Sequence, residues 1–144
     1  MPPETSIDTS HDDFEYESPF AQLLGIRHHP TVDGLGLASM TIEDKHRQRA
    51  GVVQGGIIVT LADYAFHLAC ETRLSAGQTA VTVELKLNFI APARAGELTA
   101  TAWCERRGRS LCFARGEIRD AQGELLALAT GTFKLLDRTP APAA

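Results

Sequence analysis

The hydrophobic pattern is strongest over residues 52–70, where apolar residues recur at steps of one, three and four. This spacing predicts a helix that is apolar around most of its circumference, and therefore a central helix that the rest of the chain surrounds. Its apolar positions are Ile57, Ile58, Leu61, Ala62, Ala65, Phe66, Leu68 and Ala69. Asp63 is the single carboxylate in this stretch. A carboxylate in such a helix must be paired, reach a water-filled cleft or raise its pKa.

The second half of the chain changes to an alternating pattern. Residues 81–89 alternate apolar and polar side chains without a break, which predicts a β-strand. Turn sequences at 92–96, 106–109 and 120–123 separate further predicted strands at 97–105, 110–119 and 125–136. Consecutive strands joined by tight turns predict an antiparallel sheet, and the long helix can cover its apolar face. The pattern therefore predicts an α+β domain.

The first third of the chain is less regular. The sequence of residues 18–25 predicts a short helix, with a serine cap, proline in the first turn and glycine at the end. Strand character follows at 26–29 and 36–42, and a polar, basic loop at 43–51 leads into the central helix, which we expect to end near 73–77.

Composition sets the domain boundaries. A chain of 144 residues suits one domain, which we place at 18–137. Residues 1–17 carry six acids and no Lys or Arg, so we expect a disordered acidic tail, with a second short tail at 138–144. Without the first tail, 12 acids face 14 Lys and Arg, a slightly basic balance that would not repel an anionic ligand.

Net charge and hydropathy exclude several functional classes. The net charge is -4 with 22% charged residues, which disfavours an electrostatic nucleic-acid binder. No apolar run reaches membrane-spanning length, and no leader with a basic segment followed by an apolar one is evident, so we expect a cytoplasmic protein.

The cysteines and histidines do not predict a metal site. Cys70, Cys104 and Cys112 lie in apolar runs without zinc spacing, which indicates buried free thiols. The histidines, His28, His29 and His46 among them, show no ligand spacing either, so no metal site is predicted.

The glycine pair Gly55-Gly56 opens the central helix. The first N–H groups of a helix have no partner within it, and glycine lets another molecule approach them, so the pair could present donors to an oxygen that gains negative charge. The alternative to this functional role is that the glycines allow a tight turn against a neighbouring strand and that Asp63 lies at a solvent-exposed edge. Spacing alone leaves both open.

Helix geometry constrains any shared role for the glycines and the acid. Gly55 and Asp63 are eight residues apart, which is about 12 Å along a helix axis. Groups acting on one reacting centre must come within about 3–3.5 Å of it. If both groups act on one substrate, a second subunit supplies one of them across a two-fold interface.

These features together resemble a known family. The chain places Gln54-Gly55-Gly56 eight residues before Asp63, and the stretches 83–97 (VELKLNFIAPARAGE) and 123–127 (GELLA) also match. Over residues 18–137 it resembles hotdog-fold acyl-CoA thioesterases of the PaaI type and the related 4-hydroxybenzoyl-CoA thioesterases. The resemblance implies an antiparallel sheet wrapped around one long helix. It also implies a homodimer or homotetramer, with sites built from two chains.

The resemblance also implies residue roles. Gly55 matches the glycine whose backbone N–H holds the thioester carbonyl, and Asp63 matches the catalytic nucleophile or general base. Gln48 matches a residue that positions water or the thioester, and Thr82 a hydroxyl near the attacking water. No cofactor is implied, because coenzyme A belongs to the substrate.

Five further residues are candidates for substrate binding. Gly56 extends the helix N-terminus, and Gln54 stands where the family usually has a histidine, so proton transfer from that position is lost. His67 lies one turn beyond Asp63, with a structural histidine as the alternative. Arg107 and Arg109 flank a turn and could bind coenzyme A phosphates or be solvated turn charges.

Three hypotheses follow. The first is hydrolysis of an acyl-CoA thioester to the free acid and coenzyme A. The second, motivated by Gln54, is a non-catalytic acyl-CoA-binding hotdog protein with a regulatory or scaffolding role. The third, a hotdog hydratase or dehydratase, is disfavoured because the usual acid–histidine motif is not present.

Overall fold

The computed structural model describes residues 18–29 and 31–138. The predicted tail at 1–17 and the tail at 138–144, apart from Arg138, lie outside the described residues. In chain order the elements are α1 (Pro19–Leu24), β1 (Arg27–His28), β2 (Leu35–Thr41), the 3₁₀ helix η1 (Asp44–His46), α2 (Gly55–Glu71), β3 (Gln78–Phe89), β4 (Glu97–Arg107), β5 (Leu111–Arg119) and β6 (Leu125–Asp137). No helix in this part of the chain combines the length and apolarity that a membrane crossing requires.

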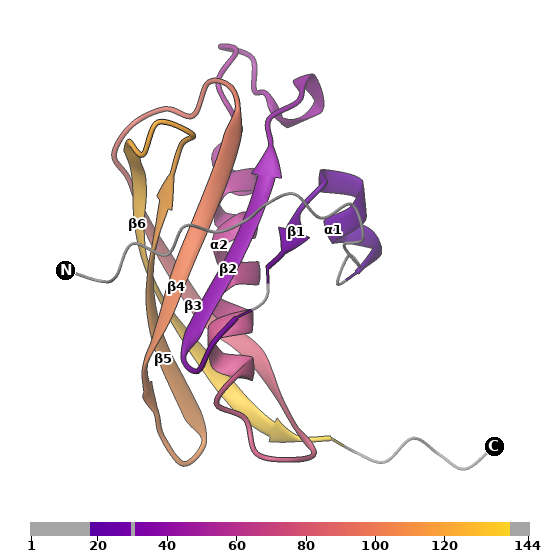
Figure 1. The fold of residues 1–144 in the computed structure, drawn as a ribbon, viewed down its shortest axis with the longest axis vertical. Helices are drawn as coiled ribbons and strands as arrows, with labels where there is room; N and C mark the ends of the chain where they lie inside the picture. Colours follow the sequence, from indigo (N-terminus) through magenta and orange to yellow (C-terminus); the bar gives the residue numbers. More distant parts are fainter. Residues whose placement is uncertain (1–17, 30, 139–144) are drawn as a thin grey trace.

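The strands form one antiparallel sheet in the order β1-β2-β4-β5-β6-β3. The sheet curls around α2, and α1 and β1 lie on the side of β2 away from β4 (Figure 1). The predicted α+β arrangement, an antiparallel sheet wrapped around one long helix, is confirmed.

One connection differs from the predicted succession of tight turns. Residues 92–96 do not close a hairpin, because β3 is the edge strand beside β6, whereas β4 lies between β2 and β5. The segment carries the chain across the sheet, and its Ala93 is buried. Local turn residues do not encode which strands become neighbours.

The short helix α1 forms as its sequence predicts. The Ser18 hydroxyl accepts a hydrogen bond of 3.1 Å from the backbone N–H of Ala21, and Gly25 ends the helix in the left-handed region at φ 74°. Ser18 also shares a 2.8 Å hydrogen bond with the hydroxyl of Tyr64, which ties α1 to α2.

The apolar face of α2 forms the centre of the core. Its buried residues are Ile58, Leu61, Ala62, Ala65, Phe66, Ala69 and Cys70. The helix ends at Glu71, slightly sooner than predicted, because the Thr72 side chain bonds the last turn and the neighbouring loop: its hydroxyl donates to the carbonyl of Ala69 at 2.7 Å and accepts from the N–H of Gly34 at 2.8 Å. Gly36 on β2 lets the sheet approach closely, since a Cβ there would overlap the carbonyl oxygen of Ala65 and lie 2.5 Å from the amide nitrogen of Ala69.

Candidate functional site

The carboxylate of Asp63 meets the edge strand of the sheet. The Thr82 hydroxyl donates a hydrogen bond of 2.8 Å to Asp63 Oδ1. Asp63 is half-buried in the middle of α2, and Thr82 is exposed on β3. The carboxylate of Asp63 therefore lies at the boundary between the core and the exposed edge of the sheet, where water and a second molecule can reach it.

A β-bulge gives Thr82 this orientation. Thr82 pairs with Phe133 and Glu84 with Thr132, so the register of β3 against β6 shifts between Thr82 and Glu84. In an unbroken strand Thr82 and Leu85 would point to opposite faces. Because of the bulge, Thr82 turns toward α2 and Leu85 and Leu87 also pack against the core. Sequence alternation places Thr82 with the outward-facing polar residues, and it contains no sign of the bulge.

The N-terminus of α2 is open. Gln54 is the N-cap residue, but its side chain makes no capping hydrogen bond. Its backbone N–H donates to the carbonyl of His46 at 2.8 Å, which fixes the approach to the helix. Gly55 is half-buried and Gly56 is exposed. No side chain in the described part of the chain caps this end. The N–H of Ile57 donates to the carbonyl of Gln54 at 3.0 Å, so the N–H groups of Gly55 and Gly56, with the positive end of the helix dipole, remain available to an anionic oxygen.

An apolar cavity adjoins this end of the helix. Its volume is about 300 Å³ and its lining runs from Gly55 and Ile58 on α2 to the segment after β3. The lining residues are Val53, Gly55, Ile58, Phe89, Ile90, Ala91, Pro92, Ala93 and Leu126. Sequence reasoning missed this cavity, although the apolar run at 89–91 directly after a strand was its one available signal. A cavity of this lining suits an apolar group rather than a charged one.

Gln48 lies in the loop between η1 and α2, where its side-chain oxygen accepts a 2.5 Å hydrogen bond from the N–H of Ala50. The fold thus places Asp63 and Thr82 in contact, while the amide of Gln48 bonds its own loop within one chain.

The remaining candidates lie further along α2 and at its C-terminal end. His67 is half-buried, one turn beyond Asp63. The guanidinium of Arg107 donates to the carbonyl of Arg73 at 3.2 Å, to Ser75 Oγ at 3.1 Å and to Gln78 Oε1 at 2.8 Å. Arg109 is exposed in the turn between β4 and β5. Of the two arginines, Arg109 is the one that a phosphate can reach without breaking these three hydrogen bonds.

Two of the histidines hold the fold together. His46 is buried: Nδ1 accepts from the backbone N–H of Glu43 at 2.9 Å, and Nε2 therefore donates to the carbonyl of Leu24 at 2.9 Å. His29 is also buried, and its Nε2 lies 2.6 Å from the hydroxyl of Ser39. Burial, followed by the positive charge of Arg27, lowers the pKa of His29 below its ordinary value.

The cysteines give an unexpected result. Among the described residues, one group has the composition and proximity of a metal site: the sulfurs of Cys70, Cys104 and Cys112 all lie within 4.8 Å of one another. Sequence spacing predicted no metal site, because these ligands converge only through the fold. Burial raises the pKa of Cys104 to about 12, and the hydrogen bond to Cys70, followed by burial, raises the pKa of Cys112. At neutral pH both are protonated thiols.

Comparison with known proteins gives consistent matches. The family model described as the thioesterase superfamily matches residues 50–127. A provisionally named esterase of Deinococcus radiodurans is 37% identical over 115 residues, covering 78% of this chain and 76% of the relative. Acyl-coenzyme A thioesterase 13 of Mus musculus is 30% identical over 95 residues, covering 63% of this chain and 66% of that protein. The structure of the E. coli PaaI protein from the phenylacetic acid degradation operon superposes with a TM-score of 0.78 at 29% identity, covering 85% of this chain and 88% of that one.

Proposed function

Because the chain belongs to the thioesterase superfamily, we propose that it hydrolyses an acyl-CoA thioester to the free acid and coenzyme A. The observation that carries this proposal is the hydrogen bond between Thr82 and Asp63. It holds a half-buried carboxylate in a fixed orientation at the edge of the sheet, as a general base or nucleophile requires.

The open N-terminus of α2 supplies the second part of the reaction. The N–H of Gly55 donates to the thioester oxygen, and the helix dipole stabilises the negative charge that grows there during attack. The acyl group occupies the apolar cavity beside Gly55, which is large enough for a short aliphatic or aromatic group. Coenzyme A extends outward, where Arg109 is the more accessible phosphate ligand.

Asp63 then acts in one of two ways. As a general base it takes a proton from water while the water oxygen bonds to the carbonyl carbon. As a nucleophile it forms an acyl anhydride that water cleaves. In both, the carbon–sulfur bond breaks and coenzyme A leaves as a thiol after protonation. Thr82 orients the carboxylate, and Gln48 orients the water or the thioester.

Two copies of the chain complete each site. Gly55 and Asp63 of one helix lie about 12 Å apart along its axis, too far to act on one carbonyl group. The edge strand β3 carries Asp63's partner Thr82, and its Val81 and Val83 are exposed, as expected of a strand that pairs with another copy. We therefore propose a two-fold dimer in which Gly55 of one subunit and Asp63 of the other face the same thioester.

A thiol-release assay over acyl-CoAs with short, long and aromatic acyl groups tests the proposal. Hydrolysis of at least one substrate is expected, with a loss of about 10²–10⁴-fold in Asp63→Asn. Glu71→Gln is the matched control, because it removes an exposed carboxylate from the last turn of the same helix.

The rival is acyl-CoA binding without hydrolysis, motivated by the uncharged Gln54 at the helix entrance. Tight acyl-CoA binding with no thiol release across the panel would establish the rival and contradict our proposal. Unchanged hydrolysis in Asp63→Asn would remove Asp63 from the mechanism.

A further inference from the structure

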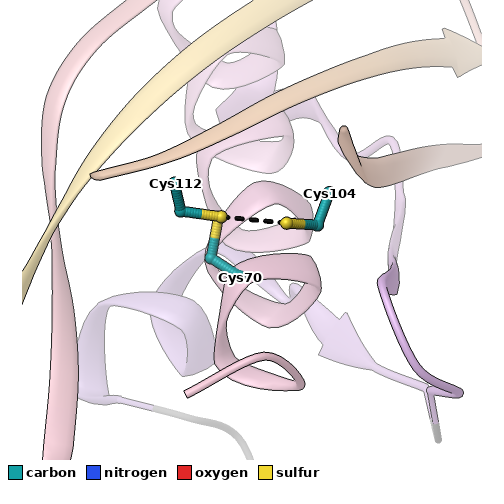
Figure 2. Close-up of side chains that lie close together, drawn as sticks. All are labelled: Cys70, Cys104 and Cys112. Carbon is teal, nitrogen blue, oxygen red and sulfur yellow. Dashed lines mark hydrogen bonds between the residues drawn. The ribbon is translucent and has the colours of Figure 1, made fainter. Parts of the chain in front are cut away.

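A cluster of thiol side chains lies at the opposite end of α2 from Gly55. Cys70 is in the last turn of α2, Cys104 is on β4 and Cys112 is on β5, and the three sulfurs point toward one another (Figure 2). The Sγ atoms of Cys104 and Cys112 are 3.0 Å apart. We infer that these three residues form a binding site for a trivalent, thiophilic metalloid, of which arsenous acid is the simplest form.

The geometry suits one ion held by three sulfurs. With bonds to sulfur of about 2.3 Å, three sulfurs around one pyramidal trivalent centre lie about 3.5 Å apart. Here all three lie within 4.8 Å of one another, so small side-chain rotations suffice. Cys104 pairs with Ala114 on β5, and Cys112 is two residues from Ala114, so both cysteines point to the same face of the sheet.

The ligand atoms select a soft ion. Sulfur ligands favour thiophilic ions, whereas Mg²⁺ and Ca²⁺ require oxygen. Among the described residues, the group of potential ligands at this position consists of three cysteines, without a carboxylate or an imidazole. Cys70 and Cys112 have no exposed surface, so a fourth, tetrahedral ligand could come only from solvent on the Cys104 side. An ion that is satisfied by three sulfurs therefore fits this site better than Zn²⁺.

Charge balance favours a trivalent centre over a monovalent or divalent ion at this site. Three thiolates around a monovalent ion leave two negative charges in the core, and around a divalent ion they leave one, each at a desolvation cost. A trivalent centre leaves none. In the reaction, three S–H hydrogens join the three hydroxyl groups of As(OH)₃ and leave as water. Three As–O bonds break, three As–S bonds form, and arsenic stays trivalent, so no oxidant or reductant takes part.

The site has a route of entry and is separate from the proposed catalytic groups. Cys104 is half-buried whereas Cys70 and Cys112 are buried, so the β4 side is the proposed route by which neutral arsenous acid reaches the cluster. Cys70 is seven residues beyond Asp63 and 15 beyond Gly55, which is about 10 Å and 22 Å along the helix. The inference therefore does not depend on thioester hydrolysis.

The test uses the full chain, reduced and titrated with arsenite. The chain has three cysteines in all, so every arsenic–sulfur bond must come from this cluster. Native mass spectrometry should show one arsenic per chain, and X-ray absorption at the arsenic edge should show three sulfur neighbours. Zn²⁺ and Mg²⁺ serve as the four-coordinate and the oxygen-preferring comparison.

Single variants identify the ligands. Cys70→Ser, Cys104→Ala and Cys112→Ser should each lower arsenite affinity by orders of magnitude. Cys104→Ala is the safeguard against misfolding, because Cys104 is the most exposed of the three, and circular dichroism checks its fold. Asp63→Asn should bind arsenite like the unmodified chain, which keeps this test apart from the test of hydrolysis.

The inference would be overturned by less than one arsenic per folded chain, by two rather than three sulfur neighbours, or by undiminished affinity in the folded Cys104→Ala variant. Stoichiometric uptake of Zn²⁺ with no uptake of arsenite would also overturn it.

Discussion

The Thr82 hydroxyl donates a 2.8 Å hydrogen bond to the Asp63 carboxylate, which is 19 residues away in the chain and on a different element. The bond joins the centre of α2 to the edge strand β3. It requires the register shift between Thr82 and Glu84, since without that shift either Thr82 or the apolar residues that follow would face solvent. A local irregularity of one strand therefore sets the orientation of the candidate catalytic acid.

Removal of this hydroxyl should slow hydrolysis without unfolding the protein. Thr82→Val keeps the shape and β-propensity of the side chain but loses a hydrogen bond to a charged group, worth about 1.5–3 kcal/mol. If that stabilisation is realised in the transition state, kcat falls about 10–100-fold. Thr82→Ser restores the hydroxyl and should recover most of the rate. Equal rates for the Val and Ser variants would show that the bond has no role in turnover.

The backbone donor at Gly55 can be removed by a single substitution. Proline has no N–H and is well tolerated at the first position of a helix. Gln54, at φ -57° and ψ 131°, already has a backbone conformation that suits a residue before proline. Gly55→Pro should therefore fold and lose about 10²–10³-fold in kcat, the usual effect of one oxyanion donor.

Gly55→Ala is the matched control for that experiment. It keeps the N–H and adds a Cβ that would lie 3.3 Å from the ring of Phe89. This variant measures only the effect of crowding at the cavity, because the N–H donor is still present. Its kcat should therefore exceed that of Gly55→Pro by at least about tenfold, which is the part of the loss due to the missing donor. Similar losses in both variants would assign the effect to crowding rather than to the donor.

The fold depends on close packing between Gly36 and α2. In Gly36→Ala, the added methyl group would overlap helix backbone, which cannot move aside as a side chain can. We expect a loss of about 3 kcal/mol or more in the free energy of unfolding, measured with urea. Gly56→Ala is the control, since its Cβ would meet nothing within 4 Å. An unchanged free energy of unfolding in Gly36→Ala would mean that the sheet does not approach α2 this closely.

Burial of His29 should make stability depend on acid pH. Because its pKa is lowered in the folded state, the unfolded chain binds the proton more readily once the pH falls through about 6.5, the ordinary value for histidine. Protonation then favours unfolding, so the free energy of unfolding should decrease as the pH falls from about 7.5 to about 5.5. These two values lie about one pH unit above and below the ordinary pKa of histidine.

The His29→Asn variant separates this effect from that of the other histidines. Its absolute stability is not the readout. The change in unfolding free energy between the two pH values should be smaller than in the unmodified protein, and an equal change would contradict the assignment to His29.

Local signals in the sequence predict most of the fold. The serine cap and Gly25 define α1, the helical spacing defines α2 and the alternation defines β3, because each is encoded within a few residues. The family resemblance over residues 18–137 implies roles for Gly55, Asp63 and Thr82 together. The contact between the last two becomes visible only in the structure.

The features that sequence reasoning missed all depend on long-range packing. The β3 bulge, the crossing at 92–96 and the apolar cavity arise when the sheet curls around α2. The three cysteines meet because a helix end and two strands converge, and their separations along the chain carry no information about that. Such features require the register and curvature of the sheet, which periodicity does not specify.

Mixing two inactive variants tests the shared site most directly. In a heterodimer of Asp63→Asn and Gly55→Pro subunits, one of the two sites would combine an intact Gly55 with an intact Asp63 of the partner. After equal amounts are unfolded and refolded together, half of the dimers should be mixed and each should have one working site, which gives about a quarter of the unmodified activity. Activity no greater than the average of the two variants measured alone would contradict a site built from two subunits.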